Sequence, residues 1–212
     1  GTNIKNKDTT FAVEGKFQPG DVVKALLNAG ADVNEKWMSG RATGVRGMSA
    51  MVLAAANAHY ELASFLLDKG ADPNAADHGW TALHEITWVR RPGGGDNDPA
   101  PDGSGSMTSL EFVRKLAAKG ANLNARMTRP GLPGGHTGRT LVNMIGATPF
   151  FMAARGADAP LMRLLIELGA DPLIPNADNT QPLLVAAGIG TLFAGEDPGT
   201  ENEVIDALKV CL

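Results

Sequence analysis

The chain has 212 residues, of which 43% are apolar and 20% are charged, and this composition excludes a disordered tail and a fibrous protein. Its 19 basic and 23 acidic residues leave a net charge of -4, so no overall positive field exists to hold a nucleic acid. The single cysteine, Cys211, excludes an internal disulfide and a cysteine-based zinc site. The chain is long enough to bury a core without such staples, so we expect a globular protein.

The sequence contains no candidate transmembrane segment. Its least charged stretch, residues 180–195, is 16 residues long and contains Pro182, which makes it too short and too broken to cross about 30 Å of hydrocarbon. The chain opens on Gly1 without an apolar leader core, so we expect that any leader has been removed. The compartment stays open between cytoplasmic and exported.

A short phrase recurs along the chain, each time at the end of an apolar helical run. Each copy contains Gly-Ala-Asp or Gly-Ala-Asn, and its glycine suits the left-handed residue that ends a helix. The copies span residues 25–34, 65–74, 115–124 and 164–172, with their glycines at Gly30, Gly70, Gly120 and Gly169.

A second phrase precedes the helix pairs and is fullest at residues 77–84, where it reads Asp-His-Gly-Trp-Thr-Ala-Leu-His. Thr81 and Thr148 are predicted to cap helices, because a threonine hydroxyl accepts a free backbone N-H at a helix start. Pro149 suits the first helical position, where its missing N-H costs nothing. The repeating unit is therefore a helix, a short turn, an antiparallel helix and an outward turn, which we call a finger.

This combination resembles the ankyrin repeat, whose Thr-Pro-Leu-His-x-Ala signature and 33-residue period match the phrases above. The resemblance implies an all-α solenoid of about five helix-turn-helix repeats in a single domain covering residues 1–212, and the long loops are typical of bacterial members. The residues that carry the repeat signature are Gly30, Gly70, Thr81, His84, Gly120, Thr148, Pro149 and Gly169. The repeats are expected at residues 9–34, 47–74, 79–124, 146–173 and 179–212.

The spacing of the repeat glycines departs from the ankyrin period, at 40, 50 and 49 residues. The distance from Ser49 to Gly70 and from Thr148 to Gly169 is 21 residues in both units, so those helix pairs are intact and the excess lies in the fingers. The third unit has its excess between its two helices instead. We expect inserts at residues 35–46, 90–109, 125–145 and 190–203, the first and third in fingers and the other two on the opposite edge.

The two ends of the repeat array differ from its middle. Residues 9–17 match a first helix only loosely, which indicates a degenerate terminal repeat. The last helix stops at Leu212, about three residues before the expected glycine, and its apolar face has no polar cap. We therefore expect the native chain to continue beyond this sequence.

The candidates for chemistry are few. His84 and His59 occupy structural positions of the repeat, His136 lies in a glycine-rich finger, and Cys211 falls at a core position, where an inert buried thiol is expected. The glycine-rich stretches at residues 92–95 and 134–138 lack the flanking residues of a phosphate-binding loop. The acids of residues 96–102 have a spacing that fails the calcium-loop pattern, which leaves a calcium site as a minor alternative. We predict no catalytic residue, no metal site and no cofactor.

Charge separates the two edges of the predicted solenoid. The finger segments 35–48 and 126–143 carry net charges of +2 and +3, whereas the opposite-edge segments 90–109 and 190–203 carry -1 and -4. Solvated loop charge explains this as readily as a binding surface does. If a partner protein binds here, an acidic or mixed-charge surface is expected on the basic fingers.

The resemblance implies a non-enzymatic module that binds another protein on its fingers and first-helix face. One alternative is an accessory domain or subunit of a larger complex, such as an exported bacterial enzyme, and a lesser one is ion or ligand binding at residues 96–102. The partner-binding residues that we expect are Trp37, Met38, Arg41, Arg46, Trp80, Arg126, Met127, Arg129, Leu132 and Arg139.

Overall fold

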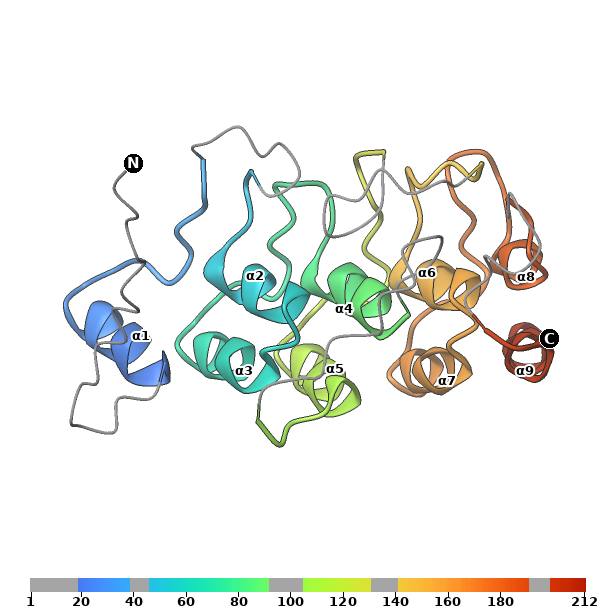
Figure 1. Ribbon diagram of the computed structural model, residues 1–212. Helices are drawn as coiled ribbons and strands as arrows, with labels where there is room; N and C mark the ends of the chain where they lie inside the picture. The colour runs from blue at the N-terminus through green and yellow to red at the C-terminus, as the bar shows by residue number, and fades with distance from the viewer. Residues whose placement is uncertain (1–18, 39–45, 92–104, 131–140, 191–198) are drawn as a thin grey trace, which may run out of the picture. The chain divides into compact units, whose positions relative to one another are not determined.

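Helix pairs recur along the computed structural model, which describes residues 19–38, 46–91, 105–130, 141–190 and 199–212 (Figure 1). The chain divides into two compact units, residues 1–32 and 33–212. The first unit contributes one described helix, α1 (Pro19–Asn28). The second contains α2 (Ala50–Ala56), α3 (Tyr60–Asp68), α4 (Ala82–Arg90), α5 (Ser109–Ala118), α6 (Pro149–Arg155), α7 (Ala159–Glu167), α8 (Pro182–Ala186) and α9 (Glu201–Cys211).

Threonines begin four of these helices, α4, α5, α6 and α9. The Thr148 hydroxyl accepts from Phe151 N at 3.1 Å, so it satisfies one of the free N-H groups of α6. In α4 the Thr81 N-H donates to His84 Nδ1 at 3.1 Å, and His84 Nε2 lies 3.2 Å from the carbonyl oxygen of Ala147 in the next repeat. His84 therefore caps its own helix and links it to the following one.

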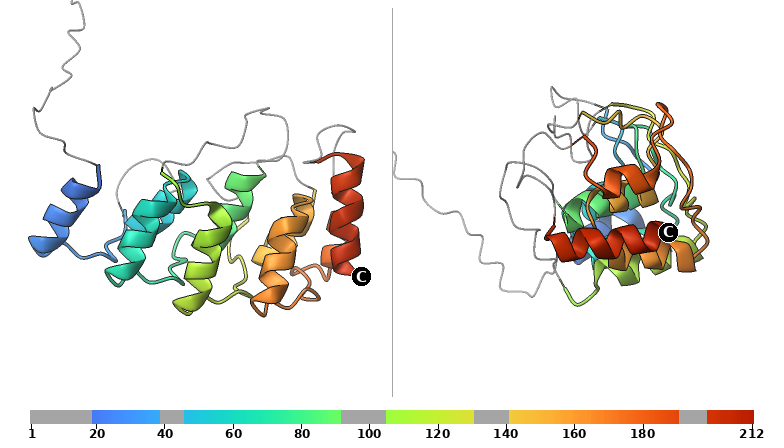
Figure 2. Two further views of the ribbon diagram at one scale, coloured as in Figure 1. Left: turned by 90° about the horizontal axis from the view of Figure 1, so that it is seen from below. Right: turned by 90° about the vertical axis from the view of Figure 1, so that its right-hand side faces the viewer.

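Within residues 33–212 the helices form two layers (Figures 1 and 2). The first helix of each pair, α2, α4, α6 and α8, packs beside the next one, and the second helices α3, α5, α7 and α9 form the other layer. The all-α solenoid that the repeats predict is confirmed. The largest fully buried side chains are Met48, Met51, Leu83, Ile86, Phe112, Leu116, Met127, Phe150, Phe151, Leu161 and Met162.

In three of the repeats, the asparagine four residues after the repeat glycine joins neighbouring repeats where the second helix ends. Asn34 Nδ2 donates to Gly70 O at 3.1 Å, and Asn34 Oδ1 accepts from Asp72 N at 2.8 Å. Asn74 makes the same two bonds to Gly120 O and Asn122 N, at 3.0 and 2.7 Å. These bonds satisfy backbone groups just past each helix end, which is why the phrase ends in Asn.

Ion pairs join the repeats on the edge opposite the fingers. Arg90 Nε and Nη2 contact the two carboxylate oxygens of Asp158 at 2.6 and 2.8 Å, and Arg91 Nη2 lies 2.6 Å from Glu203 Oε1. Residues 201–203, expected within an insert, belong to α9, because Thr200 and Glu203 cap each other and begin the helix there. In the part of the chain that the structure describes, no helix is long and apolar enough to span a bilayer.

Candidate functional site

Two of the fingers have paired main chains at their bases. Trp37 N donates to Met48 O at 3.0 Å and Gly47 N donates to Trp37 O at 2.7 Å, which fixes the base of the first finger. Met127 pairs in the same way, donating to Ala147 O at 2.9 Å and accepting from Gly146 N at 2.7 Å. These bonds join the two chain segments at the base of each of these fingers.

Neighbouring fingers also bond to one another. Thr128 N donates to Gly79 O and Ala177 N donates to Ile145 O, each at 2.9 Å. The fingers therefore form a continuous row along the upper edge in Figure 1. A partner that contacts several of the described finger segments meets one surface.

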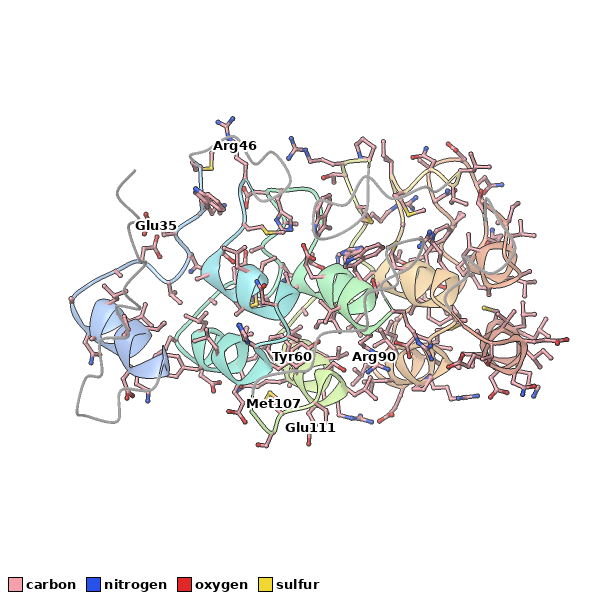
Figure 3. All side chains as sticks on the ribbon, viewed as in Figure 1. Glu35, Arg46, Tyr60, Arg90, Met107 and Glu111 are labelled. Atoms are coloured by element: carbon pink, nitrogen blue, oxygen red, sulfur yellow. The ribbon has the colours of Figure 1, made fainter. Side chains whose placement is uncertain are left out.

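The ten residues expected to bind a partner fall into three groups. Trp37 and Met38 are 43% and 59% exposed, and Arg46, Arg126 and Arg129 are also exposed, with Arg46 extending from the finger edge in Figure 3. Met127 and Trp80 are buried, at 1% and 4%. The remaining three, Arg41, Leu132 and Arg139, lie outside the described residues.

Met127 and Trp80 are buried, whereas Trp37, which makes the same two main-chain bonds as Met127, is exposed. In the extended finger backbone, neighbouring side chains point to opposite sides. Met127 is buried and its neighbour Arg126 is exposed, as this alternation predicts, and Met48 is buried at the base of the first finger. Met127 and Trp80 therefore belong to the core of this fold and not to its exposed surface.

The first-helix face of α6 is not exposed. Every residue from Pro149 to Ala154 is buried, including Phe151 and Met152. A partner cannot reach these side chains without displacing what covers them. Of the two parts of the expected binding surface, the fingers are accessible in the described residues and this helix face is not.

A polar cluster lies beneath the second finger. Glu85 is fully buried, its carboxylate accepts from Trp80 Nε1, and its Oε1 atom lies 3.6 Å from Nε2 of the buried His78. Among the described residues, both ring nitrogens of His78 and Oε2 of Glu85 have no hydrogen-bond partner. The rings of His78 and Trp80 meet edge to face at 5.1 Å.

The sequence contains one sign of this cluster. The residues four positions after the capping residues of α2, α4, α6 and α8 are Leu53, Glu85, Met152 and Val185. Glu85 is therefore a charged residue at a repeat position that is otherwise apolar. The repeat signature predicts no role for Glu85 or His78. A comparison of residue types at this position across the repeats would have identified Glu85, because an acidic residue at a position that is otherwise apolar indicates a buried polar site.

Groups able to perform chemistry are scarce. No set of three or more His, Cys, Asp or Glu side chains in the described segments is arranged to hold a metal ion. Cys211 is half-buried, less than its core position predicts, and this burial raises the pKa of its thiol. The acids at residues 96–102 lie outside the described residues.

Comparison with protein families gives two matches. A family model of ankyrin repeats, in three copies, matches residues 10–91, and the single ankyrin-repeat model matches residues 145–177. Comparison with curated proteins finds no significant match. The two family matches together cover more than half of the chain and contain the helix pairs α2/α3 and α6/α7. The chain therefore belongs to the ankyrin-repeat family.

Proposed function

We propose that this protein is a non-enzymatic module that binds another protein on its fingers. Ankyrin repeats generally mediate protein-protein interaction, and that family role is the starting point. The observation that carries the proposal is the exposure of Trp37 and Met38 on a hairpin fixed by main-chain hydrogen bonds. An exposed aromatic residue that is already held in place loses little entropy when a partner covers it.

The basic side chains on the same edge set the character of the partner. Arg46, Arg126 and Arg129 are exposed, and Lys36 is paired with Asp77 at 2.6 Å. Arginine beside an apolar anchor is typical of interface hot spots. We infer an acidic or mixed-charge protein surface as the partner, and not a nucleic acid, because the chain as a whole has a net charge of -4.

The test is to purify the native complex and compare the wild-type chain with Trp37→Ala/Arg129→Glu. The double variant should bind at least about tenfold more weakly, as expected for removing an interface anchor and reversing a charge. Arg163→Glu, a charge reversal at an exposed position of α7, is the matched control. Unchanged affinity of the double variant would contradict the finger assignment and favour the opposite edge.

A second candidate function is that of an accessory domain or subunit in a larger complex, such as an exported bacterial enzyme. The observation that favours it is the apolar surface of the last helix pair, where Leu184, Ile189 and Ile205 are all exposed. Exposed apolar groups of this kind mark protein interfaces. Lysine substitution at Leu184 and Ile205 should then disrupt the complex, whereas the finger variant should leave it intact.

A further inference from the structure

The described arginines differ in their partners. Three that lie in helices or at their ends pair with carboxylates: Arg90 with Asp158, Arg91 with Glu203, and Arg114 with Glu167 at 2.7 Å. Two finger arginines do not. Arg126 Nη2 donates to Pro175 O at 2.9 Å and Arg129 Nη1 to His78 O at 3.4 Å, and no carboxylate among the described residues pairs with either.

Two glycines hold these arginines against the neighbouring fingers. A Cβ atom placed on Gly146 would lie 2.7 Å from Arg126 Nη2, and one on Gly79 would lie 2.7 to 2.8 Å from the aliphatic stem of Arg129. Each arginine side chain therefore packs against a glycine, at a place where the Cβ atom of any other residue would collide with it. The carbonyl bond uses one N-H donor of each guanidinium, and among the described residues the remaining donors have no carboxylate partner.

The two arginines lie on opposite sides of one finger strand. Arg126 reaches toward residues 146 and 175, whereas Arg129 reaches toward residues 78 and 79. Between them Met127 is buried and Thr128 bonds to Gly79, so the strand cannot rotate freely. The pair thus presents two fixed cationic groups across three consecutive fingers.

We propose that Arg126 and Arg129 receive two carboxylates of an acidic protein segment that lies across the fingers. This inference rests on the proposed function, because it presumes that the fingers bind a protein. The planar fork of arginine matches a carboxylate with two parallel hydrogen bonds, and a fork that is already oriented loses less entropy on binding.

Carboxylates fit this surface better than a run of phosphates. Asp77 and Asp178 lie on the neighbouring fingers, where they contact Lys36 and Asn143. A nucleic acid carries one charge at every nucleotide and would meet these acids, whereas an acidic peptide can place its carboxylates only where the arginines stand.

The test uses a defined probe, a capped twelve-residue peptide with glutamate at every third position, and a lysine peptide of the same design. NMR of the arginine Nε-H groups reports binding at each side chain. The glutamate peptide should shift the Arg126 and Arg129 signals and the lysine peptide should not. Replacement of either arginine by Gln should weaken binding about two- to fivefold, the range for exposed charge pairs. Arg163→Gln should leave it unchanged.

The double variant Arg126→Lys/Arg129→Lys separates fork recognition from charge alone. If this variant binds the glutamate peptide about as weakly as Arg126→Gln/Arg129→Gln does, the proposal is supported. If it binds the peptide as tightly as the wild type does, the proposal is overturned. Unmoved arginine signals at millimolar glutamate peptide, or tighter binding of a twelve-nucleotide oligothymidylate at the same arginines, would also overturn it. A native partner whose affinity depends on Trp37 but not on these arginines would leave the proposed function standing and remove this inference alone.

Discussion

Asp158 begins helix α7 and holds Arg90, 68 residues earlier in the chain, in a two-pronged ion pair. Its Oδ1 atom accepts from Leu161 N at 3.2 Å as the helix cap and also from Arg90 Nη2 at 2.8 Å. The Asp158 side chain is 2% exposed and that of Arg90 is 20% exposed, so water screens the pair weakly. In Figure 3 Arg90 lies where α4 approaches the second layer of helices.

We predict that Asp158→Ala lowers the free energy of unfolding by about 3 to 5 kcal/mol, because it removes a cap and leaves Arg90 partly buried without its counter-charge. Asp158→Asn keeps a cap acceptor and should cost less. Asp206→Ala, which breaks an exposed pair with Lys209, is the control and should change stability by under about 0.5 kcal/mol. Urea denaturation measures all three, and equal losses for Asp158→Ala and Asp206→Ala would contradict the prediction.

Stability should fall as the pH drops below the ordinary range of histidine. Burial lowers the pKa of His84 to about 4, from an ordinary value near 6.5. Between these two values the unfolded chain binds one more proton than the folded chain, so stability is complete above about pH 6.5 and declines toward pH 4. The total loss from this group is about 3 kcal/mol.

Thermal or urea unfolding between pH 7 and pH 5 tests this, because most carboxylates stay ionised there. His84→Gln keeps a side chain able to complete the cap with Thr81 and should flatten the pH dependence. His59→Gln, at an exposed position, should retain the wild-type slope. A slope in His84→Gln as steep as in wild type would show that another group is responsible.

Replacement of Asn74 by Ala should lower the free energy of unfolding by about 1 to 3 kcal/mol. The variant loses two hydrogen bonds to the next repeat and leaves Gly120 O and Asn122 N without those partners. Asn34→Ala removes the same pair of bonds one repeat earlier and should cost a similar amount. Denaturant midpoints give both values, and a loss confined to one of the two variants would contradict the shared role.

The buried cluster of His78 and Glu85 should show non-additive energetics. Glu85→Leu alone should destabilise the protein by about 1 to 3 kcal/mol, because Trp80 Nε1 loses its acceptor and His78 its neighbouring carboxylate. Glu85→Leu/His78→Ile places the residue types of Leu53 and Ile145 at both positions and should be less destabilised than Glu85→Leu, or more stable than wild type. A double-mutant cycle measures the coupling, and strict additivity would refute it.

The helical framework could be predicted from the sequence because its determinants are local. Capping threonines, the glycine at each helix end and the apolar spacing act within about ten residues, so they place helix pairs without knowledge of the fold. Thr148 and Pro149 at the start of α6 are an example. The family resemblance and the position of the fingers followed from the same phrases.

Which finger side chains are exposed was decided by tertiary structure. Met127 is buried, but Trp37, which makes the same two main-chain bonds in the first finger, is 43% exposed, so main-chain pairing alone does not decide which side chain is covered. The joining of Arg90 to Asp158 likewise depends on how successive repeats stack. Local sequence determines where helices begin and end, but contacts between segments distant in the chain determine which side chains are buried, paired or left available to a partner.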